Sequence, residues 1–344
     1  IRDSPMPAKV MGIFVAGDKA YVGNAEHGLR IVDVSNPASP TVIGALSMPG
    51  SVHQPIVVGT TAYTVNGDQG LFATDVSDPA HPTPIGSLDT PGAAWGLAVA
   101  NGIAYVACAE DGLEIIDVSD PHDLRELGSF DTPGQVYDVA VAGARAYLAD
   151  GERGLRIVDV VDPTDLVELG TYDTPVVANG LAVSGSTAYI ADWWDGLYAI
   201  DVADPAHPAL ADAYRTPGYA LDVVLAGTTA VVADADGGLC LMDVADPAHL
   251  VHISSLAVLG WTGGVAVSAK TAYVAAGYSG LHILDASDPA HPAEIGSLRT
   301  AGSTNAVVLR GDIAYLVDGW SGPVSYTHLT LPTNRVAGGG GGGG

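Results

Sequence analysis

The chain repeats one pattern every 42 residues, and this repeat constrains the fold more than any other feature. A Gly-Leu dipeptide begins at positions 28, 70, 112, 154, 196, 238 and 280, with no insertion between them. An aspartate follows each glycine at a fixed distance, from Asp33 to Asp285, and a proline comes four residues after each aspartate. A fixed period of this length is typical of repeat architectures, in which each unit is one supersecondary motif.

Each unit contains four strand-like runs separated by turn residues. In the unit 93–134 the runs read WGLAVANG, IAYVACAEDG, LEIIDVSDP and LRELGSFDTPG. Four short antiparallel strands in a repeat of this length are typical of a propeller blade. No run shows the 3.6-residue apolar period of a helix, so helices should be nearly absent. We therefore predict an all-β fold, a β-propeller of four-stranded antiparallel blades.

The repeated residues describe turns and packing. In DTPG, proline sets φ at the second turn position and glycine supplies a positive φ at the third, as in a type II turn. The aspartate that ends each third strand is interpreted as an Asx-turn residue rather than a catalytic acid. The first strand of each unit carries the smallest side chains, so we place it at the crowded propeller axis. The last strand should be the outer edge, and the tyrosine of the Ala-Tyr pair should pack between blades.

Blade count and domain limits follow from where the pattern begins and stops. Seven full repeats cover 9–302, and a partial eighth covers 303–322. Residues 1–8 align with the end of a fourth strand, so Ile1–Pro5 could complete the eighth blade. We predict one propeller over 1–322 with eight blades, the eighth incomplete; seven blades is the alternative. Residues 323–344 resemble translated sequencing adapter followed by a glycine run, and we interpret them as an artefactual, disordered tail without function.

The third strand carries a family resemblance. It reads LRIVD at Leu29–Asp33, LEIID at Leu113–Asp117 and LRIVD again at Leu155–Asp159. These units resemble LVIVD repeats. The resemblance implies a β-propeller of bacterial or archaeal proteins, often surface-associated, with no defined activity and no catalytic residues to transfer. WD40 and tryptophan-docking quinoprotein propellers fit less well, because their Gly-His, Trp-Asp or once-per-blade tryptophan signals do not recur here.

Composition limits the partners. The formal net charge is −26, from 39 acidic and 13 basic residues, which argues against nucleic acid and anionic membranes as partners. No apolar run is long enough for a transmembrane helix. Cys108 and Cys240 occupy different positions in different repeats, so we expect no structural disulfide. We expect a monomer at the cell surface or outside the cell.

One face of the predicted disc varies between repeats. Strand direction places the loops between second and third strands on the same face as the inter-blade DTPG loops, and we call this the top face. It receives all five tryptophans and several tyrosines, namely Trp95, Trp193, Trp194, Trp261, Trp320, Tyr137, Tyr219 and Tyr278. Variable residues on a constant scaffold are typical of a recognition surface. The alternative is that the rings only pack the loops against each other.

Acidic residues should form a second ring on the top face. The end of the second strand carries Asp150, Asp192 and Asp234, and Asp138 and Asp222 begin their inner strands. Such a rim could hold Ca²⁺, which prefers several oxygen ligands. Solvated turn acids are the preferred interpretation, so we assign no metal and no cofactor. His81, His207 and His291 recur in DPAHP turns of the opposite face, and we interpret them as turn residues.

We predict a non-enzymatic binding or scaffold propeller of a surface or secreted prokaryotic protein, which recognises a protein, peptide or glycan on its top face. The alternative is a glycan lyase or hydrolase in the central funnel, with a constellation such as Asp138, Asp222 and His53. We disfavour an enzyme because the sequence has no nucleophile elbow, zinc motif or phosphate loop. The candidate binding residues are His53, Trp95, Tyr137, Asp138, Asn179, Asp192, Trp193, Trp194, Asp222, Asp234 and Trp261.

Overall fold

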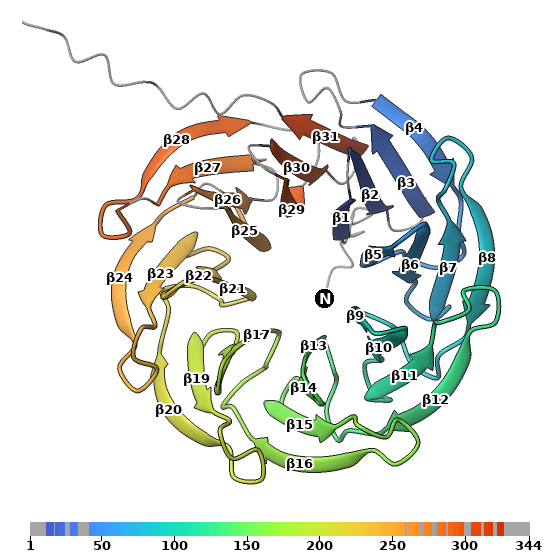
Figure 1. Cartoon of the computed structure of the whole chain (residues 1–344). Helices are drawn as coiled ribbons and strands as arrows, with labels where there is room; N and C mark the ends of the chain where they lie inside the picture. The colour runs from blue at the N-terminus through green and yellow to red at the C-terminus, as the bar shows by residue number, and fades with distance from the viewer. Residues whose placement is uncertain are drawn as a thin grey trace, which may run out of the picture.

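A computed structural model shows eight antiparallel sheets arranged in a ring (Figure 1). It describes residues 12–326 except 17, 25–27, 34–40, 259, 269–270, 277–278, 280, 287, 299–303, 311–312 and 319–321. Seven sheets have four strands in sequence order, and the eighth has three. Within the described residues every regular element is a strand, so the predicted all-β propeller and its eight blades are confirmed. Ile1–Pro5 and Trp320 lie outside the described residues.

The strands of each blade run from the axis outward, as Figure 1 shows. The inner strands are β1 (Gly12–Ala16), β5 (Pro55–Val58), β9 (Gly96–Ala100), β13 (Asp138–Ala142), β17 (Gly180–Ser184), β21 (Asp222–Ala226), β25 (Gly264–Ser268) and β29 (Thr304–Arg310). The second strands are β2 (Lys19–Asn24), β6 (Thr61–Val65), β10 (Ile103–Ala107), β14 (Arg145–Ala149), β18 (Thr187–Ala191), β22 (Thr229–Ala233), β26 (Thr271–Ala275) and β30 (Ile313–Asp318).

The third and fourth strands complete the blades toward the rim. The third strands are β3 (Gly28–Asp33), β7 (Leu71–Asp75), β11 (Leu113–Asp117), β15 (Leu155–Asp159), β19 (Leu197–Asp201), β23 (Leu239–Asp243), β27 (Leu281–Asp285) and β31 (Gly322–Tyr326). The fourth strands are β4 (Thr41–Leu46), β8 (Thr83–Leu88), β12 (Arg125–Phe130), β16 (Val167–Tyr172), β20 (Ala209–Tyr214), β24 (Val251–Leu256) and β28 (Ala293–Leu298). The predicted inner and outer positions of the first and last strands are confirmed.

The eighth blade extends past the predicted boundary at residue 322. Strand β31 pairs with β30, with Leu316 opposite Val324 and Tyr315 opposite Ser325. This is the register that the third strand has in the preceding blades, because Pro323 stands one repeat after Leu281. The expectation that the tail is unstructured from 323 onward is therefore wrong for 323–326, where a run with β-forming residues continues the ladder.

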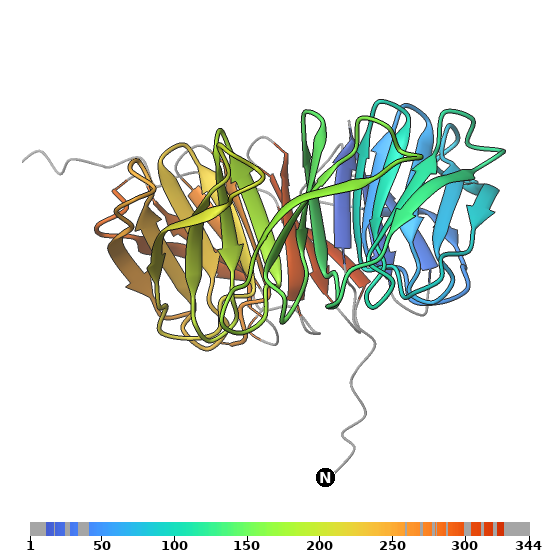
Figure 2. The same ribbon diagram turned by 90° about the horizontal axis from the view of Figure 1, so that it is seen from below.

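The hydrophobic core lies between blades rather than inside one sheet. One cluster joins Leu113 and Ile115 of β11 to Leu148 and Val158 of the next blade. Ile116, on the opposite face of β11, packs against the preceding blade. Because both faces of the third strand are buried, it reads as a continuous apolar run. Figure 2 shows the ring of blades edge-on.

The recurring tyrosine lies at these interfaces, as predicted, and it also adds a polar contact. The Tyr63 hydroxyl is buried and donates to the Val118 carbonyl of the next blade at 2.9 Å. Tyr189 makes the equivalent contact with the Val244 carbonyl at 3.5 Å. A buried hydroxyl needs such a partner, so this position ties neighbouring blades together while its ring fills the interface.

A β-bulge recurs between the third and fourth strands of all seven four-stranded blades. At Gly128 an added Cβ would lie 2.0 Å from the Pro163 carbonyl oxygen of the next blade. In two other blades a side chain occupies this position and bonds the neighbouring turn: Ser254 Oγ donates to the Pro289 carbonyl at 2.6 Å, and Asp212 accepts the Leu250 N–H at 2.7 Å. The bulge therefore sets the contact between the outer strand and the next blade.

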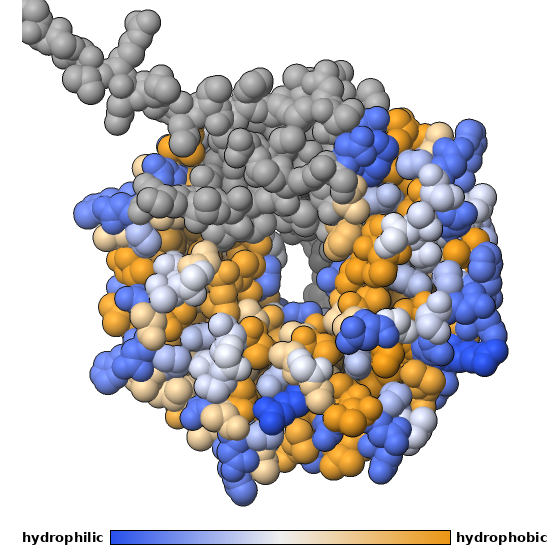
Figure 3. Space-filling model, in the orientation of Figure 1, coloured by the Kyte–Doolittle hydropathy of each residue, from blue (hydrophilic) through white to orange (hydrophobic). Residues whose placement is uncertain are grey.

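The ring leaves an opening at its centre, which the space-filling view shows (Figure 3). Hydrophilic residues project around the outer rim in the same view. The inner strands surround the opening, so a residue at the start of an inner strand lies close to the axis. This arrangement places the start of each inner strand beside the top-face loops.

Candidate functional site

In the second to sixth blades, the top-face loops between second and third strands share one turn. In the fourth blade the Asp150 N–H donates to the Gly154 carbonyl at 2.7 Å, and the Gly154 N–H donates to Gly151 at 3.1 Å. The Gly151 carbonyl also accepts the Ala178 N–H of the next blade at 2.9 Å. Gly151 has φ of +54°. Each of these five loops is held to the next blade through a residue in the left-handed region.

The acids that end the second strands are buried. Asp150, Asp192 and Asp234 have no exposed surface. The Thr174 hydroxyl donates to Asp192 Oδ1 at 2.7 Å, and the Val176 N–H donates to Oδ2 at 3.1 Å. The expectation of an exposed acidic rim at these positions, including candidate residues Asp192 and Asp234, is therefore wrong. Their carboxylates are used to hold the inter-blade loop.

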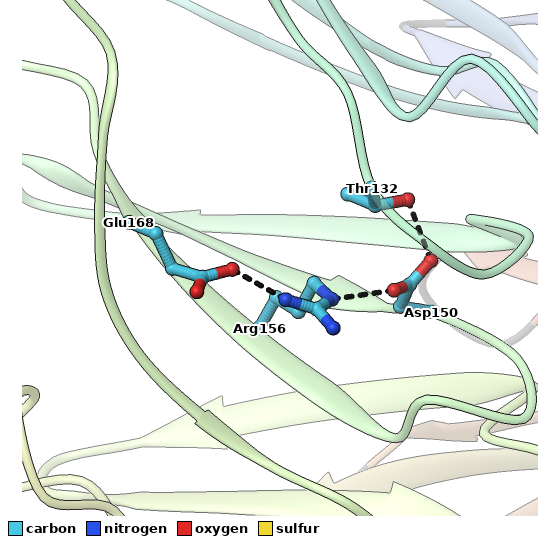
Figure 4. Close-up of polar contacts among 4 residues, drawn as sticks. All are labelled: Thr132, Asp150, Arg156 and Glu168. Atoms are coloured by element: carbon cyan, nitrogen blue, oxygen red, sulfur yellow. Dashed lines mark hydrogen bonds and ion pairs between the residues drawn. The ribbon is translucent and has the colours of Figure 1, made fainter.

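Asp150 belongs to a larger network, drawn in Figure 4. Its Oδ1 accepts the Thr132 hydroxyl at 2.7 Å, and its Oδ2 lies 2.5 Å from Arg156 Nε. Arg156 reaches Glu168 on β16 through Nη1, also at 2.5 Å. The guanidinium is buried between the two carboxylates and compensates both, so the network is a structural element of the blade.

Asp138 and Asp222 face the axis but use their oxygens on the backbone. Asp138 accepts the Val139 N–H at 2.9 Å and the Leu181 N–H of the next blade at 3.2 Å. Asp222 accepts the Val223 N–H at 2.8 Å. Burial, then the charge of Asp138, raises the pKa of Asp222 to about 6. Burial also raises the pKa of Asp138.

A glutamine performs the same task two blades earlier. The Gln54 side-chain oxygen accepts the Leu97 N–H of the next blade at 3.0 Å. The intervening blades have glycine, and a Cβ on Gly180 would lie 2.9 Å from the Leu221 carbonyl oxygen. Acceptor side chains and glycines therefore alternate from blade to blade. A comparison of single repeats does not reveal this pattern, because its period is two blades.

Aromatic rings form two arcs on the top face. The first arc is His53, Trp95 and Tyr137: the His53 and Trp95 ring centroids are 5.0 Å apart, and Trp95 meets Tyr137 edge-on at 6.1 Å. It crosses three successive blades. The hypothesis that these sequence-distant rings lie together is supported by this geometry.

The second arc contains Trp194, Trp193, Tyr219 and Trp261. Trp193 stacks on Trp194 at 5.0 Å and approaches Tyr219 at 6.0 Å, and Tyr219 stacks on Trp261 at 5.8 Å. Asn179 directly precedes the inner strand β17 of the blade that carries Trp193 and Trp194, and it is half-buried. Tyr278 lies outside the described residues.

Trp193 holds an unfavourable backbone conformation. Its φ is +44°, in the left-handed region. The equivalent residues in the neighbouring blades are Gly67, Ala109, Gly151 and Ala235. A bulky residue with positive φ is a conformational outlier, and such strain is concentrated at functional sites.

A cavity of about 460 Å³ lies between the two arcs. Tyr137 and Trp193 line it from opposite sides, together with Gln135, Arg153 and Glu152. The Tyr137 hydroxyl donates to Gln135 Oε1 at 2.6 Å, and Gln135 Nε2 donates to Glu110 at 2.8 Å. The sequence analysis did not select Gln135 and Arg153 as candidate binding residues. Arg153 could have been recognised from the sequence, because it is basic where the neighbouring repeats have Asp111 and Asp195.

The opposite face contains short hydrogen-bonded turns, as predicted. The Asp75 carboxylate accepts the Ser77 N–H at 2.8 Å, which is an Asx turn. Asp78 accepts the Ala80 N–H at 3.1 Å and contacts His81 Nδ1 at 2.9 Å. His207 and His291 make the same contact within their own turns. The interpretation of these histidines as turn residues is confirmed.

No group of three or more His, Cys, Asp or Glu residues in the described part of the chain is arranged to hold a metal ion. Within the same part, no helix is long and apolar enough to span a bilayer. Cys108 and Cys240 are both free and buried, in agreement with the expectation of no disulfide between them. Burial raises the pKa of each thiol to about 12.

Comparisons with known proteins agree with the fold. A computationally designed protein, Ika8, superposes with a TM-score of 0.79 at 10% identity, covering 94% of this chain and 97% of the other. Sqt1 from Saccharomyces cerevisiae gives 0.76 at 8% identity, with 94% and 96% covered. Sqt1 from Chaetomium thermophilum, bound to the N-terminus of the ribosomal protein L10, gives 0.76 at 12% identity, with 93% and 97% covered. At these identities the similarity concerns the fold alone.

Comparison with curated protein sequences gives no match. The family model described as LVIVD repeat matches seven successive segments, which are 7–47, 49–90, 91–132, 133–174, 177–216, 217–258 and 259–300. These segments cover most of the chain and coincide with the seven four-stranded blades. The chain belongs to the LVIVD-repeat family.

Proposed function

We propose that this chain is a non-enzymatic binding module of a surface or secreted protein, and that it recognises a peptide or glycan on its top face. The observation that carries the proposal is the cavity of about 460 Å³ between two arcs of aromatic rings. Its volume falls within the range of about 300–1,000 Å³ that is usual for ligand sites. The rings on both sides offer large contact area at low cost in side-chain entropy.

Trp193 favours binding over simple loop packing. Packing needs no bulky residue at a left-handed position, because the neighbouring blades close the same turn with glycine or alanine. The other rings also leave surface free for a ligand: Trp95 is 39% exposed, and Trp194 and Trp261 are each 48% exposed. A surface built only to hold loops would bury these rings more completely.

The fold is able to hold a peptide. The similar Sqt1 propeller from Chaetomium thermophilum is bound to the N-terminus of the ribosomal protein L10. The buried thiols present no reactive sulfur to an oxidising medium and are therefore compatible with the proposed extracellular setting. We further propose that the module acts as a monomer, which its gel-filtration volume tests.

The proposal is tested by screening the full chain against a glycan and peptide array. The parent is compared with Trp95→Ala and Trp194→Ala, and with Val161→Ala as a control at a residue that is 71% exposed. We expect both tryptophan variants to lose signals that the valine variant keeps. If the tryptophan variants keep every interaction of the parent, the top face is not the binding surface.

A catalytic alternative is kept because the pKa of Asp222 is raised to about 6, a range suited to acid–base catalysis. The use of both axial acids as backbone acceptors favours a structural role, and so does Gln54, which cannot transfer a proton as a carboxyl does. Incubating a panel of oligosaccharides with the parent and with Asp222→Asn distinguishes the two. Turnover that disappears in the variant supports the enzyme.

A further inference from the structure

We propose that the ligand of the top-face cavity is a basic peptide segment, whose lysine or arginine side chain lies against the aromatic arcs. This inference rests on the proposed function, and it selects one ligand class from those that the function allows. Three features support it, namely the charge of the surrounding loops, the pairing of rings with carboxylates, and the contrast with the opposite face.

The loops around the arcs are strongly acidic. Between residues 48 and 262, the top-face loops carry nine acids that are at least partly exposed and two basic residues, Arg153 and Arg215. The acids are Asp68, Asp89, Glu110, Asp111, Asp131, Glu152, Asp173, Asp195 and Asp236. An acidic surface attracts cationic ligands and repels acidic ones, so charge alone disfavours an acidic glycan or peptide.

Carboxylates accompany both arcs. Glu110 and Glu152 lie close enough to Tyr137 for their charges to raise the pKa of its hydroxyl, after the larger effect of burial. Asp195 follows Trp194 directly and accepts the Tyr198 hydroxyl at 2.6 Å. A cation that lies over an aromatic face with a carboxylate at its edge gains from the ring quadrupole and from the ion pair.

The opposite face is also acidic but lacks the other elements. Its carboxylates accept N–H groups of their own turns, as Asp204 and Asp288 do, and they contact His207 and His291. Each of the chain's tryptophans that the structure describes lies in a top-face loop. Rings, carboxylates and a cavity therefore coincide on the top face.

Two neighbouring residues of one loop provide a matched test of ligand charge. Glu152 and Arg153 are both exposed, both line the cavity and carry opposite charges. For a basic ligand, Glu152→Gln should weaken binding and Arg153→Gln should strengthen it. For an acidic ligand, Glu152→Gln should strengthen binding and Arg153→Gln should weaken it.

The experiment measures the tryptophan fluorescence of the full chain during titration with three peptides of equal length. They alternate glycine with arginine, glutamate or serine. Titration at about 0.3 M salt, where the Debye length is about 6 Å, suppresses attraction to the net charge of the whole chain. Glu126→Gln, on the outer strand β12, is the control for loss of one acid away from the cavity.

We expect the arginine peptide to bind and the other two to fail. Trp194→Ala should weaken that binding by about tenfold and Glu152→Gln by about threefold, whereas Glu126→Gln should leave it unchanged. The inference is overturned if the arginine peptide does not bind, if the Trp194 and Glu152 variants bind it as tightly as the parent, or if Arg153→Gln abolishes binding. An array signal from an acidic peptide or glycan that depends on Trp194 would refute the basic ligand and support the proposed function. An array without any tryptophan-dependent signal would refute both.

Discussion

Glu114 makes the stability of the third blade depend on pH. It lies on β11 with only 3% of its surface exposed, and its pKa is raised to about 7, first by burial and then by the charge of Glu126. In two other blades the equivalent residues are partners, since Arg156 forms an ion pair with Glu168 and His282 Nδ1 contacts Glu294 at 3.1 Å. In the third blade two acids meet instead, so the folded state favours the protonated form of Glu114.

The magnitude follows from the two pKa values. A group whose pKa is higher in the folded state destabilises that state as pH rises from its ordinary value, 4.5, to its folded value, about 7. A tenfold change in proton affinity is worth about 1.4 kcal/mol, so the full cost is about 3 kcal/mol above pH 7 and about 1 kcal/mol at pH 5. Glu114→Gln removes the titration while keeping the side-chain size.

The assay is urea unfolding of the parent and Glu114→Gln at pH 5 and at pH 8.5. We expect the variant to be more stable by about 3 kcal/mol at the higher pH and by about 1 kcal/mol at the lower. Glu126→Gln serves as the control and should give a smaller gain, because the charge of Glu126 is the second cause of the shift. If Glu114→Gln gains equal stability at both pH values, Glu114 is not titrating in this range and the reasoning is refuted.

Three further substitutions test the structure by thermal or urea unfolding. Trp193→Gly should change the free energy of unfolding by no more than about 1 kcal/mol, because relief of the left-handed strain offsets the lost ring contacts. The same substitution should abolish the ligand signals on the array. A large loss of stability would assign Trp193 to packing. Gly128→Ala should destabilise by about 1–3 kcal/mol, since the new methyl meets the Pro163 carbonyl, and an unchanged midpoint would contradict this contact. Arg156→Ala should cost about 3 kcal/mol, because it leaves the buried Asp150 carboxylate without its cation, and a cost below 1 kcal/mol would contradict that role.

The repeat alone was sufficient to predict the propeller and the position of each strand within its blade. Local rules explain this success: alternation and side-chain size act within a few residues, and a 42-residue period presents them many times over. The type II turn predicted for DTPG is wrong at Gly92, Gly134 and Gly218, whose φ is not positive. The Asx turns at Asp75 and Asp78 and the inter-blade role of Tyr63 were predictable for the same reason.

The roles of the acids and the shape of the site depended on the tertiary structure. Asp192 and Asp222 are equally polar in sequence, yet one accepts the Thr174 hydroxyl of an inter-blade loop and the other accepts the Val223 N–H at the axis. The burial and hydrogen bonding of a carboxylate depend on which loop of the next blade lies beside it, and the repeat pattern does not specify this contact. The two aromatic arcs and the cavity between Tyr137 and Trp193 exist for the same reason, since ring closure brings side chains of different blades within contact distance.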